Sequence, residues 1–271
     1  MQHSSDWRVN QDATNDEAYA ILSQDPIWNC FALADLEAPL RQYSQFPTAY
    51  REKSNERAIC LVLRHPSIGQ VLSPFGAEEG VTAILKHLTL PEHPLVQSQK
   101  MHISLLQHYY RPEMRWKVLL RMTITPDSLR FQAHALHQLV RQLTVSDVPA
   151  LKNLYTRHSE TAFPADLFIQ NIYFGVYEGA ELVAAGGTHV VVSKFHIAVL
   201  GNVLTAPQAR RQGYATAITT ALVMKLFELH YSPVILNVFA DNNDAIRVYQ
   251  RLGFQTRLKL LTGRATIATS E

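Results

Sequence analysis

The sequence predicts a two-domain α/β protein in which each half forms a mixed, mostly antiparallel sheet flanked by helices. The chain has 271 residues, enough for two ordinary domains, and its 47% hydrophobic content can supply substantial cores. Strand-like and helix-like segments also alternate in a similar order in both halves. Pro126 favours a break in that pattern, so we expect domains at 1–126 and 127–271.

The N-terminal half contains strand and helix patterns in mixed order. Helical patterns occupy 16–22, 28–43 and 77–88. Alternating or β-branched segments predict strands at 48–53, 58–64, 70–72, 100–104 and 116–123. The junction before the third helix, at 72–76, is the nearest counterpart of a phosphate loop in this half. It contains Pro74, and Glu78 and Glu79 follow it, so the junction is poorly suited to bind an anion. We therefore expect this half to be structural or to help shape a binding site in the C-terminal half.

The C-terminal half is predicted to begin as an antiparallel meander. Its strands are expected at 136–143, 173–177, 181–192, 195–204, 233–239 and 255–261. Helices are expected from the capping-box pattern of Thr144 and Asp147 to residue 157, and at 165–171, 213–230 and 245–252. In the long helix, four leucine or isoleucine residues repeat at helical spacing and should face the sheet: Ile218, Leu222, Leu226 and Leu229. Gly253 can end the last helix, with Phe254 folding back onto it.

Composition excludes several classes of function. The net charge of +2 gives no electrostatic reason to expect nucleic acid or a membrane as partner. Cys30 and Cys60 have no metal-site or disulfide spacing and are expected to be buried thiols. The 12 histidines are scattered, and His134 and His137 would point to opposite faces of a strand, so we expect no metal. The chain lacks a signal-peptide pattern and a membrane-length apolar run, which predicts a cytoplasmic protein.

The most informative stretch joins the end of a predicted strand to a helix that starts on a glycine. It contains Gly201, Asn202, Val203, Leu204 and Thr205, then Arg210, Arg211, Gln212, Gly213, Tyr214, Ala215 and Thr216. The first amides of a helix lack intrahelical partners and carry part of the helix dipole, and glycine permits close approach. This stretch therefore predicts a pyrophosphate cradle. Taken alone, it is also compatible with an exposed helix start and solvated arginines.

A second motif follows the next strand, which contains Asn237. Its residues are Asn242, Ala245, Tyr249, Gly253 and Phe254. Together the two stretches resemble the GCN5-related N-acetyltransferase (GNAT) superfamily, with its loop Arg/Gln-x-x-Gly-x-Gly/Ala and its later motif Asn-x-x-Ala-x-x-x-Tyr-x-x-x-Gly-Phe. The resemblance covers residues 136–261, and the superfamily accepts alanine at position 215. Residues 25–31 are similar to the start of the degenerate N-terminal domain of some two-domain bacterial members.

The resemblance implies an acyl-CoA-dependent N-acyltransferase that moves an acetyl group from acetyl-CoA to a small-molecule or peptide amine in a ternary complex. It implies that strands 195–204 and 233–239 splay around the pantetheine arm, with an amide near Val203 polarising the thioester carbonyl. Tyr249 would protonate the departing thiolate, although it could instead be a core aromatic. Asn242 would contact the arm or cap the helix, and Asn243 is an equally suitable cap. The implied cofactor-binding residues are 202–205, 210–216, Asn237, Asn242, Ala245 and Tyr249.

The sequence leaves the identity of the general base open. His189 is a candidate if it points inward, and a hydrogen-bonded core histidine is the alternative. Many relatives use a water chain, and Asn202 would orient the acceptor or a water, or satisfy backbone groups at the strand end. Tyr155, Phe163 and Tyr173 are expected to pack in the core, with the acceptor pocket as the alternative.

Three rival functions follow from the same residues. The donor could be a longer acyl-CoA, or the acceptor an amino acid, as in glycine-acyltransferase-like proteins. A non-catalytic acyl-CoA sensor would need the loop but not the acid Tyr249, so the presence of both favours an enzyme.

Overall fold

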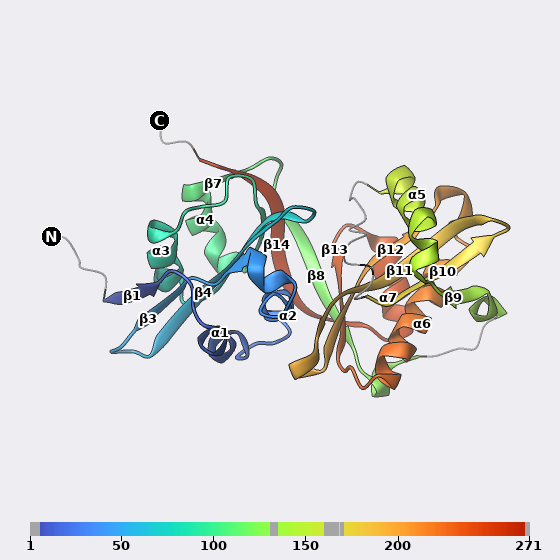
Figure 1. Cartoon of the computed structure of the whole chain (residues 1–271), viewed down its shortest axis with the longest axis horizontal. Helices are drawn as coiled ribbons and strands as arrows, with labels where there is room; N and C mark the ends of the chain where they lie inside the picture. Colours follow the sequence, from blue (N-terminus) through green and yellow to red (C-terminus); the bar gives the residue numbers. More distant parts are fainter. Residues whose placement is uncertain (1–5, 131–134, 160–167, 169–170, 269–271) are drawn as a thin grey trace. The chain divides into compact units, whose positions relative to one another are not determined.

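The computed structural model describes residues 6–130, 135–159, 168 and 171–268, and the chain divides into two compact units (Figure 1). Unit 1 comprises Met1–Leu119 and Leu258–Glu271, and unit 2 comprises Leu120–Arg257. The chain enters unit 2 within β8 (Lys117–Ile124) and returns to unit 1 within β14 (Gln255–Ile267). The domain pair 1–126 and 127–271 stays a prediction. The compact units differ from it because β14 pairs with β6 (Leu95–Ser98) of unit 1.

Unit 1 contains a mixed sheet with the strand order β1-β3-β4-β5-β6-β14. β5 and β6 pair in parallel, and the other neighbours in this order pair antiparallel. Its remaining strands are β1 (Trp7–Asn10), β2 (Ser44–Gln45), β3 (Thr48–Arg51), β4 (Glu56–His65), β5 (Gly69–Gly76) and β7 (Tyr110–Pro112). Its helices are α1 (Asn15–Leu22), α2 (Cys30–Ala34), α3 (Glu78–His87) and α4 (Ile103–Tyr109). Both cysteines are free and buried, as predicted.

Two predictions for unit 1 are wrong. The helix expected at 28–43 ends at Ala34, and a short 3₁₀ helix covers Leu40–Tyr43 after Pro39, which has no N–H to continue a helix. The strand expected at 100–104 is instead the start of a helical segment, a 3₁₀ turn followed by α4. The strand lies earlier, at β6, where Val96 pairs in parallel with Leu72 of β5. Tertiary pairing thus overrides the local pattern here.

Unit 2 contains a mixed sheet with the strand order β8-β13-β12-β11-β10-β9. The predicted antiparallel meander is confirmed as β10 (Tyr173–Glu178), β11 (Glu181–Val192) and β12 (Ile197–Thr205). β13 (Val234–Phe239) pairs in parallel with β12, and β9 (Val140–Gln142) pairs with β10. The helices are α5 (Val148–His158), α6 (Tyr214–Glu228) and α7 (Asn243–Leu252). The mixed, mostly antiparallel sheet expected in each half is therefore confirmed.

Two expectations for unit 2 change, and a third falls mostly on residues that the structure does not describe. The strand expected at 136–143 is a 3₁₀ helix over Ala135–Leu139 followed by the short strand β9. Leu229 follows the end of α6 and is 41% exposed, whereas Ile218, Leu222 and Leu226 are buried in the core as predicted. The helix expected at 165–171 falls largely outside the described residues, as do Phe163 and His134.

The end of α7 has the predicted Schellman-type cap. Gly253 has a φ of 106°, and the N–H of Phe254 donates to the carbonyl of Tyr249. The Phe254 side chain is buried, and its ring lies 5.8 Å from the Tyr249 ring in an edge-on arrangement. A β-carbon at Gly253 would lie 1.9 Å from the backbone oxygen of Ser128, so glycine is required by both conformation and space. This cap fixes the position from which α7 presents Tyr249.

The capping box before α5 includes an ion pair between the buried Asp147 and the half-exposed Arg141. Asp147 accepts hydrogen bonds from Arg141 at 2.5 and 3.1 Å, from the Thr144 N–H at 2.8 Å and from the Tyr177 hydroxyl at 2.8 Å. Arg141 is the main reason that the pKa of Asp147 lies well below its usual value. A depressed carboxyl pKa contributes stability that is present above the unfolded-state pKa and is lost as pH falls.

We expect Asp147→Asn to lower the free energy of unfolding at pH 7 by about 1–3 kcal/mol, because hydrogen bonds to a charged group are lost. The difference from wild type should shrink below about pH 4, where the unfolded-state carboxyl binds its proton. Denaturant unfolding at pH 7 and at lower pH measures this change. Asp244→Asn is the control, since the Asp244 side chain is 99% exposed. Equal destabilisation by both variants would contradict this assignment.

Among the helices that the structure describes, none combines the length and apolar character needed to span a bilayer.

Candidate active site

The two parallel strands of unit 2 separate after a short paired stretch. β12 and β13 pair at Ala198 with Val234, at Val199 with Ile235 and at Leu200 with Leu236. Within the described residues, the rest of β12, from Gly201 to Thr205, has no recorded partner on β13. Neighbouring strands normally stay hydrogen-bonded along their shared length. The separation therefore leaves unpaired backbone edges facing each other, as expected for strands that admit an extended ligand arm.

β12 also carries a bulge at the point where the strands separate. Gly187 of β11 pairs with Gly201 and Ala185 pairs with Leu204, so Gly186 alone stands opposite both Asn202 and Val203. Asn202 has a φ of 55°, in the left-handed region. A bulge interrupts the ladder and redirects backbone groups. A β-carbon on Gly186 would lie 3.1 Å from the Val203 side chain, so that side chain packs over Gly186. Val203 can thus serve the site through its backbone rather than its side chain.

The loop after β12 leads to a helix start with unused amides. Gly213 precedes α6 with a φ of 87°, and Arg211 has a φ of 65°. The first N–H groups of α6 have no intrahelical acceptor. Arg210, Arg211 and Gln212 are exposed, and Arg210 Nε donates to the Thr205 carbonyl at 3.3 Å. An anion can approach these amides closely, which fits a pyrophosphate.

Some predicted cofactor-binding residues can contribute only through their backbone. The Tyr214 side chain is buried and its hydroxyl donates to Glu178 at 2.9 Å. The Thr205 hydroxyl is buried and has no hydrogen-bond partner in the described part of the chain. Ala215 and Thr216 lie in the first turn of α6 and are partly buried. The loop is thus a backbone cradle, with Arg210 and Arg211 as its local positive charge.

Tyr249 lies on α7 and packs in the same core cluster as Tyr214 of α6 and Val238 of β13. The residue is 9% exposed, and within the described residues its hydroxyl makes no hydrogen bond. Burial raises the pKa of Tyr249 to about 12, which keeps the hydroxyl protonated at neutral pH. Tyr249 is therefore both a core aromatic and a potential proton donor.

The Asn242 side chain caps α7. Its Oδ1 accepts from the Ala245 N–H at 3.2 Å, and Asn243 is already the first residue of the helix. The structure thus selects Asn242 between the two predicted caps. Ala245 is partly buried against the core.

His189 occupies a second irregularity, on β11. Thr188 pairs with Leu200 and Val190 with Val199, so His189 is the extra residue between them. Its side chain lies over Gly201, where an added β-carbon would be 2.9 Å from the His189 Nδ1 atom. The side chain is exposed, and desolvation by the protein around it nevertheless lowers its pKa below the usual 6.5. The neutral imidazole is therefore available beside the bulge at pH 7.

Asn237 has a partner that sequence reasoning missed. Arg121 of β8 is 2% exposed, and its Nε donates to Asn237 Oδ1 at 2.9 Å. Asn237 lies on β13 just beyond the last pair with β12. The arginine comes from a distant part of the chain, and a lone arginine in a predicted strand gives no local signal of burial. This bond orients an amide at the edge of the separated strands.

The corresponding strand-to-helix junction of unit 1, between β5 and α3, differs from the one before α6. Ala77 alone separates Gly76, the end of β5, from Glu78 at the start of α3. Glu78 and Glu79 occupy the first helical turn, where negative charge disfavours an anion. His102 Nε2 lies 3.0 Å from the Gly76 carbonyl oxygen. The absence of a phosphate loop from the N-terminal half stays a prediction.

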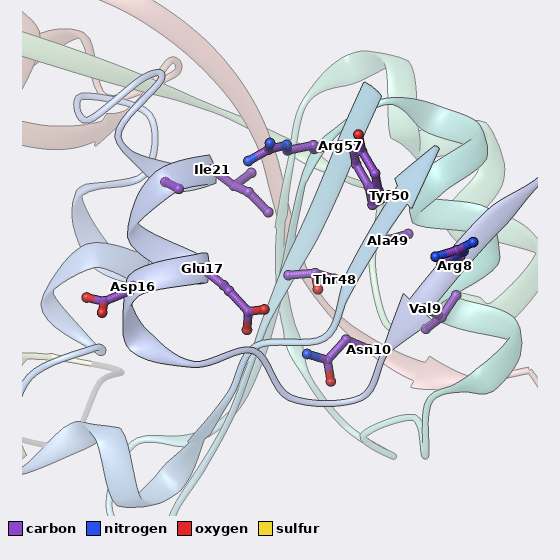
Figure 2. Close-up of a pocket in the computed structure, with 11 residues that line it drawn as sticks. Arg8, Val9, Asn10, Asp16, Glu17, Ile21, Thr48, Ala49, Tyr50 and Arg57 are labelled. Carbon is purple, nitrogen blue, oxygen red and sulfur yellow. The ribbon is translucent and has the colours of Figure 1, made fainter. Parts of the chain in front are cut away.

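Unit 1 contains a hollow of about 590 Å³ between α1, β1 and β3, shown in Figure 2. The Glu17 carboxylate points toward Thr48, and the Arg57 side chain points toward Ile21. Glu17 belongs to the capping box of α1, and Arg8 pairs with Glu52 at 2.7 Å. These charges serve local structure, and the start of α1 at this hollow is already capped by Thr14 and carries the acidic Asp16 and Glu17 in its first turn.

Residues 138–254 match the sequence model of the Acetyltransferase (GNAT) family, a span within unit 2 that contains both motifs. No curated protein matches the sequence. The solved structure of a Drosophila protein is 14% identical to this chain and has a TM-score of 0.68. The match covers 95% of this chain and 98% of the Drosophila chain. A GCN5-related N-acetyltransferase from Sphaerobacter thermophilus is 14% identical with a TM-score of 0.59, covering 97% and 96%. A tandem GNAT protein from the clavulanic acid biosynthesis pathway is 10% identical with a TM-score of 0.59, covering 98% and 99%.

At these identities the structural likeness establishes the fold. A mixed sheet with separating parallel strands and a glycine-started helix defines a GNAT-type domain in unit 2. Residues 138–254 of unit 2 match the GNAT family, and the chain shares its fold with a tandem GNAT protein over almost its whole length.

Proposed function

We propose that this chain is an N-acyltransferase that transfers an acetyl group from acetyl-CoA to a primary amine by direct attack in a ternary complex. The observation that carries the proposal is the glycine-started helix α6, which follows the bulged and separated strand β12 after a single loop. The amides of 213–216, with Arg210 and Arg211, would hold the pyrophosphate. The edges of β12 and β13, including Asn202, Leu204 and Asn237, would accompany the pantetheine arm.

The residues around the gap can divide the chemistry of acyl transfer. The Val203 amide would stabilise the negative charge that develops on the thioester oxygen. His189 would take the proton from the attacking amine, and Tyr249 would give a proton to the leaving sulfur. The lowered pKa of His189 and the raised pKa of Tyr249 keep the base neutral and the acid protonated at pH 7.

We further propose that unit 2 holds the only acyl-CoA site and that unit 1 represents the degenerate domain, with the protein acting in the cytoplasm. The buried free thiols of Cys30 and Cys60 fit a reducing compartment.

The test combines acetyl-CoA with a panel of primary amines, including amino acids, polyamines and peptides, and follows release of the CoA thiol. We expect amine-dependent release and a calorimetric stoichiometry near one CoA per chain. Absence of acetyl-CoA binding and of turnover with every amine would overturn the proposed function. Two equivalent CoA sites per chain would overturn the assignment of unit 1.

The contact between His189 and Gly201 gives a prediction about the base. An alanine at position 201 would place its β-carbon 2.9–3.1 Å from three atoms of His189 and push the imidazole away. We expect Gly201→Ala to slow transfer about 3- to 10-fold while acetyl-CoA affinity stays within about twofold, because only proton removal is impaired.

A double-mutant comparison tests whether that effect acts through His189. In a His189→Gln background, Gly201→Ala should cost little more, because coupled residues are non-additive. Desolvation lowers the pKa of His189 below its ordinary value, and the loss of kcat/KM on acidification that protonation of this imidazole causes should also disappear in His189→Gln. An undiminished effect of Gly201→Ala in that background would show that it does not act through the histidine.

A further inference from the structure

The left-handed conformation of Asn202 requires an explanation from its surroundings. Non-glycine residues rarely adopt a positive φ, although asparagine tolerates it better than most. Such conformations persist where neighbouring structure holds them. In this chain the residue lies next to Val203, whose amide we place at the thioester carbonyl. Whatever holds Asn202 therefore also aims that amide.

Two buried tyrosines hold Asn202 from different elements. The Tyr155 hydroxyl, on α5, donates to the Asn202 carbonyl. The Tyr173 hydroxyl, on β10, accepts from the Asn202 side-chain Nδ2 at 3.1 Å. Tyr155 is 4% exposed and Tyr173 is 2% exposed. Side chains this buried, with their hydroxyls engaged, cannot line an open acceptor pocket, which agrees with the core packing favoured from the sequence.

Tyr173 reaches Asn202 because Gly187 has no side chain. Tyr173 pairs with Gly187, and Gly187 pairs in turn with Gly201, so the three residues lie in register across β10, β11 and β12. A β-carbon on Gly187 would lie 2.6 Å from the Tyr173 ring, which therefore lies flat across β11 toward β12. The centroid of the Phe168 ring lies 5.2 Å from that of the Tyr173 ring. The sheet is thus built to let this tyrosine cross it.

We propose that Tyr155 and Tyr173 are positioning residues that fix the bulge at Asn202 and so direct the Val203 amide toward the donor carbonyl. This inference rests on the proposed function of the site. It assigns to Asn202 a conformational role, in which its backbone geometry matters more than a contact of its side chain with the ligand. Neither tyrosine contacts the reacting atoms.

The first test is Tyr155→Phe, which removes the hydroxyl and keeps the ring. We expect the transfer rate to fall about tenfold, less than the 10²- to 10³-fold typical of deleting an oxyanion donor, because the amide is misaligned and not removed. The affinity for acetyl-CoA relative to CoA should also fall, since only acetyl-CoA presents a carbonyl to the amide. CoA affinity itself should change by less than about twofold. Tyr177→Phe, whose hydroxyl donates to Asp147 at 2.8 Å, is the matched control and should leave both readouts unchanged.

A second pair of variants tests the conformational role and does not depend on Tyr155→Phe folding. Glycine adopts a positive φ freely and alanine does not. Asn202→Gly should therefore keep more activity than Asn202→Ala, by about tenfold if the left-handed geometry controls alignment. Equal losses in both variants would show that the left-handed geometry of residue 202 does not control alignment, and would overturn the inference.

The amide NMR signals of Asn202 and Val203 provide a readout independent of turnover. They should shift in Tyr155→Phe and not in Tyr177→Phe, with or without acetyl-CoA. An inactive wild-type protein would overturn the proposed function while these shifts still report on the bulge. Unshifted signals, or an active wild type matched by Tyr155→Phe in rate and in acetyl-CoA preference, would overturn this inference alone.

Discussion

Tyr249→Phe is expected to slow acetyl transfer by about 10- to 1,000-fold, in line with the loss of one general acid, while CoA affinity remains that of wild type. The phenylalanine keeps the ring that packs 5.8 Å from Phe254 and removes the hydroxyl alone. Because that hydroxyl makes no hydrogen bond within the described residues, its removal should cost little stability. The loss should therefore fall on turnover.

The measurement compares turnover, CoA affinity and thermal unfolding for wild type and Tyr249→Phe with any amine that proves to be a substrate. Tyr231→Phe is a suitable control, because Tyr231 is a partly buried residue packed against the same core cluster. Burial raises the pKa of Tyr249 to about 12, so its hydroxyl stays protonated well above neutral pH. Deprotonation of Tyr249 should therefore not reduce wild-type turnover until the pH approaches that value. Wild-type turnover in Tyr249→Phe would mean that water protonates the thiolate.

The same comparison separates an enzyme from an acyl-CoA sensor. A sensor needs the amides of α6 to bind the pyrophosphate, but it has no leaving thiolate to protonate. Its Tyr249 would serve only as a core aromatic, and Tyr249→Phe would have no turnover to affect. Joint loss of affinity and stability would instead assign the hydroxyl a structural role.

Local motifs account for the parts of the site that the sequence predicts well. The cradle depends on a glycine followed by a helix, and both lie within a few residues, at Gly213 and Tyr214. The cap of α7 at Gly253 and Phe254 is equally local. A short stretch of chain determines each feature, so spacing and residue type are sufficient to find them.

Features that depend on distant segments were not predictable in this way. The bulge at Asn202 is a difference in register between two strands, and sequence spacing carries no record of it. Arg121 and Asn237 meet across neighbouring strands although they are 116 positions apart. β14 continues without a break from unit 2 into unit 1. No stretch of linker-like composition therefore marks the point where the chain passes from one compact unit to the other. Only the assembled sheet brings these groups together.

The wrong helix and strand assignments have a related cause. At 136–143 the apolar alternation fits a strand, but Leu136 instead packs against the core beside Gly213. A β-carbon added to Gly213 would lie 3.0 Å from the Cδ1 atom of Leu136. Tertiary packing uses the apolar residues of a 3₁₀ segment there, and strand pairing is left to 140–142. Leu136, expected to extend the sheet, thus packs against the loop that precedes α6.

Gly213→Val is expected to weaken CoA binding tenfold or more, which corresponds to roughly 1.4 kcal/mol. Valine is strained at a φ of 87°, and its branched side chain would occupy the approach to the first amides of α6. Gly179→Val is the matched control, since Gly179 has a φ of 60° in a turn of the same unit with no atom within 4 Å of an added β-carbon. Both variants carry backbone strain, but only the first alters the proposed cradle. Calorimetry with CoA, on variants shown to be folded by circular dichroism, should find affinity lost in Gly213→Val and kept in Gly179→Val. Unchanged affinity in Gly213→Val would place the pyrophosphate elsewhere, and equal losses in both variants would attribute the effect to strain.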